Sequence, residues 1–170
     1  MFDDETLVAA ARLIDRLNEK SWWMVTAESC TGGLVAGALT SIAGSSSVVH
    51  GGFVTYANEA KVEMLGLREA TLASEGAVSE ATAREMAWGA FRTANVDLAV
   101  AITGIAGPGG GSAEKPVGLV HFAVATERVT QHERHEFGDI GRQEVRAASV
   151  KVALALALKA IDAKPRQPFL

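Results

Sequence analysis

Hydrophobic positions along this chain follow two spacings, one typical of helices and the other of buried strands. Residues 5–19 place their apolar side chains on one broad face among charged residues, which predicts an opening helix. The apolar run at residues 22–27 is too short for a helix, and a polar turn at residues 28–33 separates it from a helical pattern at residues 34–39. This order predicts a strand, a tight turn and a helix.

The alternation of strands and helices continues to the end of the chain. Further helices are predicted at residues 58–66, 80–95 and 142–161, and further strands at residues 48–56, 97–103, 117–126 and 129–137. The last two strands are close enough in sequence to form an antiparallel pair joined by a short turn. Gly51 and Gly52 predict a bulge or a close backbone approach in the second strand.

These elements predict one α/β domain over residues 1–170 with a three-layer α/β/α architecture. The central sheet is expected to be mixed and mostly parallel, and residues 165–170 are expected to form a frayed tail. The chain is 48% hydrophobic and 21% charged, which is typical of a folded, water-soluble protein. This composition excludes a disordered or collagen-like chain.

Charge and cysteine content exclude several classes of function. Sixteen basic and 20 acidic residues give a net charge of −4, so we expect no broad basic face and no nucleic-acid partner. The single cysteine, Cys30, excludes an intrachain disulfide and a multi-cysteine zinc site. The N-terminus is acidic, and the longest strongly apolar stretch, at residues 152–158, is too short to span a bilayer. We therefore expect a cytoplasmic protein at its mature length, with no membrane partner.

Polar residues follow three of the predicted strands, where open α/β sheets bind their ligands. The first of these segments carries Ser29, placed between a strand and the start of a helix. Free N–H groups of Thr31, Gly32 and Gly33, together with the helix dipole, would favour an anion or an oxyanion there. Alternatively, Ser29 or Thr31 only caps the helix.

The second segment contains Tyr56 at a strand end and Lys61 in the first turn of a helix that Asn58 is expected to cap. The helix dipole disfavours an ammonium at that position. An amine can take a proton from serine only if its pKa falls from ~10.4 toward ~7 to 8. This fall requires the charged ammonium to be destabilised by roughly 3 to 4 kcal/mol. The dipole supplies about 0.3 to 1 kcal/mol, so burial must supply the rest. The alternative is a solvated surface lysine.

The third segment, residues 103–112, is rich in glycine but has the spacing of neither a Walker A loop nor a Rossmann fingerprint. It could hold a phosphate through backbone N–H groups, or it could be a flexible turn. The residues of this loop that we expect to contact substrate are Gly104, Ile105, Ala106 and Gly107.

Five other side chains are weaker candidates. Arg142 and Arg146 lie on one face of the last predicted helix and could hold a carboxylate or phosphate, or they could form a solvated face. Cys30 adjoins Ser29 but is expected to point into the core. His132 and His135 lie three apart in a strand and so face opposite ways. We therefore expect no metal site and no cofactor.

Four segments together resemble the CinA C-terminal domain family, in the same order and over nearly the whole chain. They are A-E-S-C-T-G-G at 27–33, G-G-F-V-T-Y-A-N-E-A-K at 51–61, G-A-V-S-E at 76–80 and T-G-I-A-G-P-G-G-G-S-A-E-K-P-V-G at 103–118. The resemblance implies a five-stranded mixed sheet and a homo-oligomer. It also implies a nicotinamide-nucleotide amidohydrolase, which converts nicotinamide mononucleotide, a pyridine nucleotide, to nicotinic acid mononucleotide and ammonia.

In that family a serine, a tyrosine and a lysine act together, and these positions match Ser29, Tyr56 and Lys61. The lysine would act as the base either directly or through the tyrosine, and N–H groups near Gly32 and Gly33 would form the oxyanion hole. Substrate-binding positions are expected at Thr31, Gly32, Gly33, Asn58, Arg142 and the 104–107 loop. The alternatives are a nucleotide-binding module without chemistry and a competence-associated interaction partner.

Overall fold

The computed structural model describes residues 2–163, so the tail predicted at residues 165–170 lies outside the described residues. A five-stranded sheet has the strand order β2-β1-β3-β4-β5. The strands are β1 (Met24–Glu28), β2 (Val49–Val54), β3 (Leu98–Gly104), β4 (Leu119–Thr126) and β5 (Thr130–Glu136). The expected mixed sheet is confirmed.

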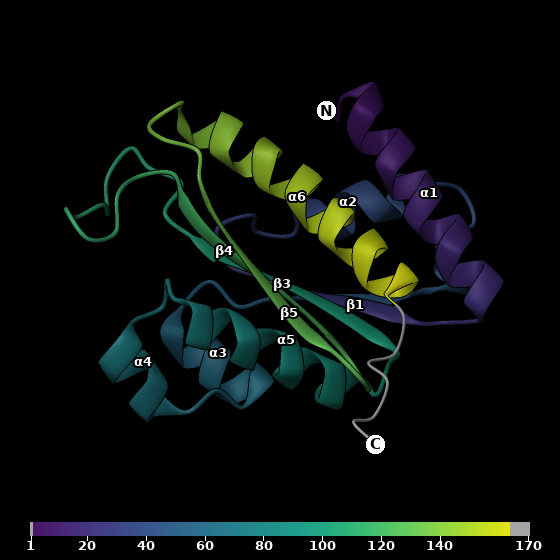
Figure 1. The fold of residues 1–170 in the computed structure, drawn as a ribbon, viewed down its shortest axis with the longest axis horizontal. Helices are drawn as coiled ribbons and strands as arrows, with labels where there is room; N and C mark the ends of the chain where they lie inside the picture. Colours follow the sequence, from purple (N-terminus) through teal and green to yellow (C-terminus); the bar gives the residue numbers. More distant parts are fainter. Residues whose placement is uncertain (1, 164–170) are drawn as a thin grey trace, which may run out of the picture.

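Helices cover both faces of this sheet, as the three-layer prediction requires (Figure 1). The helices α1, α2 and α6 lie on one face, and α3, α4 and α5 lie on the other. Their bounds are α1 (Asp4–Lys20), α2 (Leu34–Thr40), α3 (Asn58–Leu65), α4 (Glu69–Glu75), α5 (Glu80–Ala94) and α6 (Arg142–Asp162), and a short 3-10 turn, η1, spans Ser45–Ser47. Among helices in residues 2–163, none is long and apolar enough to cross a bilayer.

Strand β1 lies between two parallel neighbours, β2 and β3. The chain leaves β1 toward β2 and later crosses back to β3, so a topological switch point lies at the carboxyl end of β1. The pairs β3–β4 and β4–β5 are antiparallel, which confirms the predicted hairpin. The three polar segments that follow β1, β2 and β3 therefore meet at one edge of the sheet.

The two faces of the sheet are packed differently. Larger side chains such as Leu13, Met24, Phe122 and Leu154 fill the face under α1, α2 and α6. The face under α5 is rich in alanine; these alanines are Ala27, Ala83, Ala87, Ala90, Ala99, Ala101, Ala123 and Ala125. Small side chains on the helix and on the facing strands allow the helix to approach the sheet closely. Helix α5 is therefore held near the strands that carry the candidate site.

The structure corrects two local predictions and confirms a third. Helix α4 was not predicted, because seven residues that bury only Thr71 carry too little periodicity. Asn58 is the first residue of α3, and Ala57 is the N-cap, so the prediction that Asn58 caps this helix is wrong. The bulge expected in β2 is confirmed, since the register shifts at His50, and a Cβ on Gly52 would lie 2.6 Å from Thr26 Oγ1.

The contact between α5 and the end of α3 depends on Gly89. A Cβ at this position would overlap the backbone carbonyl of Leu65. We predict that Gly89→Ala lowers the free energy of unfolding by about 1 to 3 kcal/mol, because one helix must shift. Urea denaturation measures this loss.

Gly37 in α2 provides the matched control, because a Cβ there would meet only the ring of Phe2, at an ordinary 3.5 Å. Gly37→Ala is expected to leave stability unchanged or to raise it by up to about 1 kcal/mol, as alanine favours the helix. Equal losses in both variants would show that the contact with Leu65 is not the cause.

Candidate active site

Ser29 and Lys61 meet at the carboxyl end of β1. Ser29 directly follows the strand, and its N–H donates to the carbonyl of Ile102 in β3 at 2.9 Å. The Nζ of Lys61 lies 3.2 Å from the Oγ of Ser29. Lys61 is only 1% exposed, so the alternative of a solvated surface lysine is wrong. The two side chains come from the turn after β1 and from α3, and the fold brings them within hydrogen-bond distance.

The amine of Lys61 is surrounded by oxygen atoms without formal charge. Besides Ser29 Oγ, Nζ contacts the carbonyls of Thr55 at 2.7 Å and of Tyr56 at 3.4 Å. Burial lowers the pKa of Lys61, because water no longer stabilises the ammonium. This is the direction that a serine-activating base requires.

Glu28 is a functional side chain that the sequence reasoning missed. Its buried carboxylate accepts hydrogen bonds from the backbone N–H groups of Gly33 at 3.0 Å, Val35 at 3.1 Å and Ala36 at 2.9 Å. The N-terminus of α2 is therefore already occupied by an anion from the chain itself. A glutamate at a strand end, five residues before a Gly-containing helix start, was the available signal.

This arrangement corrects the predicted anion site. The N–H of Gly33 is used by Glu28, and the N–H of Gly32 donates to the carbonyl of Ser29 at 3.0 Å. The expectation that these two groups are free for an oxyanion is therefore wrong. By contrast, the N–H groups of Cys30 and Thr31 donate to no oxygen within residues 2–163.

Arg146 holds the outer side of the same turn. Its guanidinium donates to the carbonyl of Cys30 at 3.1 Å and to that of Thr31 at 3.2 Å. These bonds fix the peptide units next to Ser29. Arg146 is thus a structural clamp on this turn.

Arg142 joins two of the other predicted residues. At the first position of α6, its guanidinium donates to the hydroxyl of Tyr56 at 2.8 Å and to the carbonyl of Gly107 at 2.9 Å. Tyr56 follows β2 and Gly107 follows β3, and these strands flank β1. The three residues therefore bridge the turn that carries Ser29.

The remaining residues predicted to contact substrate differ in their exposure and in whether their backbone groups are free. Asn58 is exposed and lines a groove formed by residues of α3 and α4. The N–H of Ile105 donates to the carbonyl of Leu119 at 2.9 Å, so it is not available to a ligand. Ala106 is buried, and Gly104 packs against Val120 with no room for a Cβ. Within this loop Gly107 is the residue tied to the Tyr56–Arg142 pair.

The weaker candidates behave as the sequence indicated. Cys30 is buried, and burial raises the pKa of its thiol to about 12, which makes it a poor nucleophile. His132 contacts His121 at 2.9 Å, whereas His135 stacks on Phe137, so the two predicted histidines do face opposite ways. Within residues 2–163, no group of three potential ligands is arranged to hold a metal ion.

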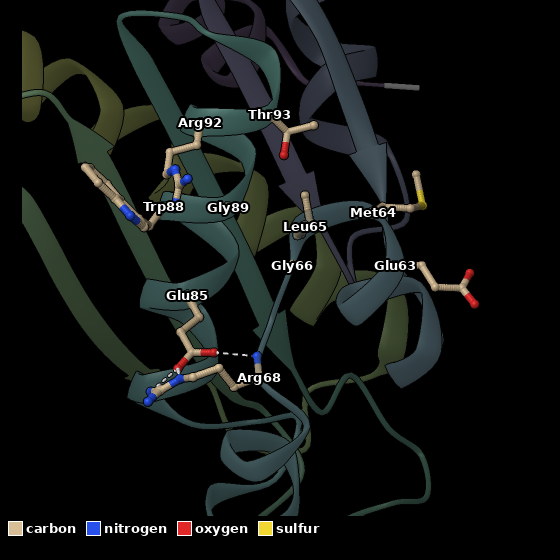
Figure 2. Close-up of a pocket in the computed structure, with 10 residues that line it drawn as sticks. All are labelled: Glu63, Met64, Leu65, Gly66, Arg68, Glu85, Trp88, Gly89, Arg92 and Thr93. Carbon is tan, nitrogen blue, oxygen red and sulfur yellow. Dashed lines mark hydrogen bonds and ion pairs between the residues drawn. The ribbon is translucent and has the colours of Figure 1, made fainter.

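A surface pocket of about 690 Å³ between α3 and α5 lies apart from this site (Figure 2). The Nε of Arg68 donates to Glu85 at 2.8 Å on one side of it, and Trp88 and Arg92 lie on the same helix as Glu85. Ser29 does not line this pocket. The geometry therefore places the reactive pair at the strand ends and not in this pocket.

The family model of the CinA C-terminal domain matches residues 7–161. The chain belongs to this family. It is 50% identical to the nicotinamide-nucleotide amidohydrolase PncC of Escherichia coli over 154 residues, covering 91% of this chain and 93% of that protein. It is 51% identical to a CinA-like protein of Syntrophobacter fumaroxidans, but there it spans only 33% of the relative's length and 84% of its own. The predicted family is therefore confirmed.

Solved structures agree with this CinA fold. The competence/damage inducible protein CihA of Agrobacterium tumefaciens superposes with a TM-score of 0.93 at 52% identity, covering 96% of this chain and 99% of that one. A competence damage-inducible protein A of Klebsiella pneumoniae superposes with a TM-score of 0.88 at 38% identity, over 94% and 99% of the two chains. The single mixed α/β architecture is thus shared across these CinA proteins.

The Glu28 carboxylate should dominate the stability of the Ser29 turn. We predict that Glu28→Ala lowers the free energy of unfolding by about 3 kcal/mol or more, because three N–H groups at the start of α2 lose their acceptor. Glu28→Gln keeps one acceptor oxygen and should lose less. Urea denaturation of the two variants measures the difference.

Glu63, an exposed glutamate in α3, serves as the control. Glu63→Ala should change stability by no more than about 0.5 kcal/mol, as surface substitutions usually do. A Glu28→Ala variant as stable as Glu63→Ala would contradict the importance of this carboxylate.

Proposed function

We propose that this chain is a nicotinamide-nucleotide amidohydrolase that hydrolyses nicotinamide mononucleotide to nicotinic acid mononucleotide and ammonia. One observation carries the proposal: a buried lysine amine lies 3.2 Å from the hydroxyl of a partly exposed serine on a strand-end turn. This pairing is what nucleophilic amide hydrolysis without histidine requires. The PncC relatives, which carry the name of this activity, support the choice of substrate.

The first step is acyl transfer to Ser29. The neutral amine of Lys61 takes the proton from Ser29 Oγ, and the oxygen attacks the carboxamide carbon of the substrate. The C=O electrons move to its oxygen, which becomes an oxyanion. We assign stabilisation of that charge to the N–H groups of Cys30 and Thr31, which have no oxygen partner among the described residues.

The second step releases ammonia and then the acid. The Lys61 ammonium returns its proton to the substrate nitrogen, the C–N bond breaks, and ammonia leaves an ester on Ser29. Lys61 then takes a proton from water, whose oxygen attacks the ester carbon. Return of the proton to Ser29 Oγ restores the enzyme and frees nicotinic acid mononucleotide. The direct contact between Nζ and Oγ favours a lysine that acts without Tyr56 as a carrier.

The substrate phosphate is assigned to Arg142 and the glycine loop. Arg142 uses one N–H for Tyr56 and one for Gly107, which leaves three of the five N–H groups of a guanidinium for an anion. A protein of net charge −4 needs such a local cation to hold a phosphate. Assigning the phosphate to Arg142 puts both ends of the substrate at the strand ends around the Ser29 turn.

Ammonia release from nicotinamide mononucleotide, compared with nicotinamide and its riboside, tests the proposed function. Ser29→Ala should lower kcat by about a thousandfold or more while the fold is retained, because the nucleophile is lost. Cys30→Ala, a change in the adjacent buried thiol, should keep most of the activity. Binding of the nucleotide without any turnover by the parent protein would instead identify a nucleotide-binding module.

Lys61 should set the acidic side of the pH profile. Its pKa is lowered by burial, so the amine is protonated and inactive below that pKa and free to accept a proton above it. We predict that kcat/KM rises with pH through this lowered pKa and then levels off. Steady-state rates across the pH range measure it.

Two substitutions at Lys61 test whether this residue acts as a general base or only supplies a positive charge. Lys61→Met keeps the apolar stem but accepts no proton, and Lys61→Arg keeps a permanent charge. Both should lose most of the activity. A Lys61→Arg variant as active as the parent would exclude the general-base role.

A further inference from the structure

We propose that the exposed ring of Tyr56 is the binding face for the cationic pyridinium ring of the substrate, and that this contact makes the site selective for the oxidised, positively charged nucleotide. The inference rests on the proposed function and adds to it a residue that discriminates substrates. It assigns Tyr56 to substrate recognition and not to proton transfer.

Tyr56 is exposed, while its hydroxyl and its backbone carbonyl are both in contact with other side chains. The residue is 60% exposed, although it adjoins the buried Thr55. Its hydroxyl accepts a hydrogen bond from Arg142 at 2.8 Å, and its backbone carbonyl lies 3.4 Å from Lys61 Nζ. A tyrosine whose hydroxyl and backbone carbonyl are both held loses little further conformational freedom when a ligand stacks on its ring, so the binding face is preorganised.

Tyr56 also lies where the substrate ring must be. The N–H of Thr55 donates to the carbonyl of Glu28 at 2.9 Å, so the backbone before Tyr56 runs beside the backbone before Ser29. In nicotinamide the carboxamide is attached directly to the pyridinium ring. A carboxamide carbon at Ser29 Oγ therefore brings the ring to the neighbouring strand end, which carries Tyr56.

The hydrogen bonds do not favour Tyr56 as a proton carrier. Its hydroxyl oxygen is engaged by Arg142, whereas Lys61 reaches Ser29 Oγ directly at 3.2 Å. A tyrosine ring attracts a cation through its negative π face, and this attraction is lost when the ring is replaced by an aliphatic side chain. Together, Tyr56 and Arg142 provide a π face for the pyridinium cation and a guanidinium for the phosphate.

The test compares two ligands that differ in ring charge. Nicotinamide mononucleotide has a cationic aromatic ring, while its reduced dihydropyridine form has a neutral ring with the same carboxamide, ribose and phosphate. Dissociation constants are measured by calorimetry in Ser29→Ala protein, so that binding is read without turnover. Ammonia release by the parent protein is measured separately and reports on the proposed function alone.

In the Ser29→Ala background, Tyr56→Leu should weaken binding of the oxidised nucleotide by about tenfold and leave binding of the reduced form within about twofold. Tyr56→Phe keeps the ring and should retain most of the preference for the oxidised form. Trp88→Leu, which removes an exposed aromatic side chain from α5 outside the site, should change neither constant.

Three results would overturn the proposal. The first is a Tyr56→Leu variant that keeps the parental ratio of the two constants, and the second is a Tyr56→Phe variant that loses as much of this ratio as Tyr56→Leu does. Failure of the Ser29→Ala protein to bind either nucleotide would overturn it as well. If the parent protein hydrolyses the nucleotide but the ratio is insensitive to Tyr56, the function stands and the stacking role does not.

Discussion

The buried carboxylate of Glu28 is the interaction on which the site depends. It connects the end of β1 to the start of α2 by accepting three backbone N–H groups, which would otherwise be unpaired at the helix terminus. The turn between these elements carries Ser29, and Arg146 holds its outer side through two carbonyls. The helix dipole is thus satisfied inside the protein, and the turn is kept in one geometry before any ligand arrives.

The lowered pKa of Lys61 follows from the burial of its amine. Buried lysines usually keep their proton by pairing with a carboxylate, but the contacts of this amine within residues 2–163 are a serine hydroxyl and backbone carbonyls. These dipoles orient the amine, while exclusion of water lowers its pKa. Burial therefore shifts Lys61 away from an ordinary surface ammonium and toward the neutral amine.

Much of the architecture could be predicted because its signals are local. Short apolar runs predicted strands such as β1, β3 and β4, and the mostly polar β5 was predicted as the antiparallel partner that follows β4 after a short turn. The polar segments after β1, β2 and β3 indicated where ligands bind. Helix α4 was missed because it buries a single threonine and so leaves almost no periodic pattern. Asn58 was assigned as a cap because its residue type favours that position, yet Asn58 is already the first residue of the helix and Ala57 is the N-cap.

The sequence by itself determined the order of the strands and of every helix but α4, the α/β class and the meeting of Ser29, Tyr56 and Lys61 at one sheet edge. Only the tertiary structure decided which group pairs with which. It placed Glu28 on the N–H group of Gly33, which the sequence had assigned to substrate, and it joined Arg142 to Tyr56 across 86 positions of sequence. Hydrogen-bond partners of this kind depend on strand order and on the packing of distant segments, which no local pattern of residues encodes.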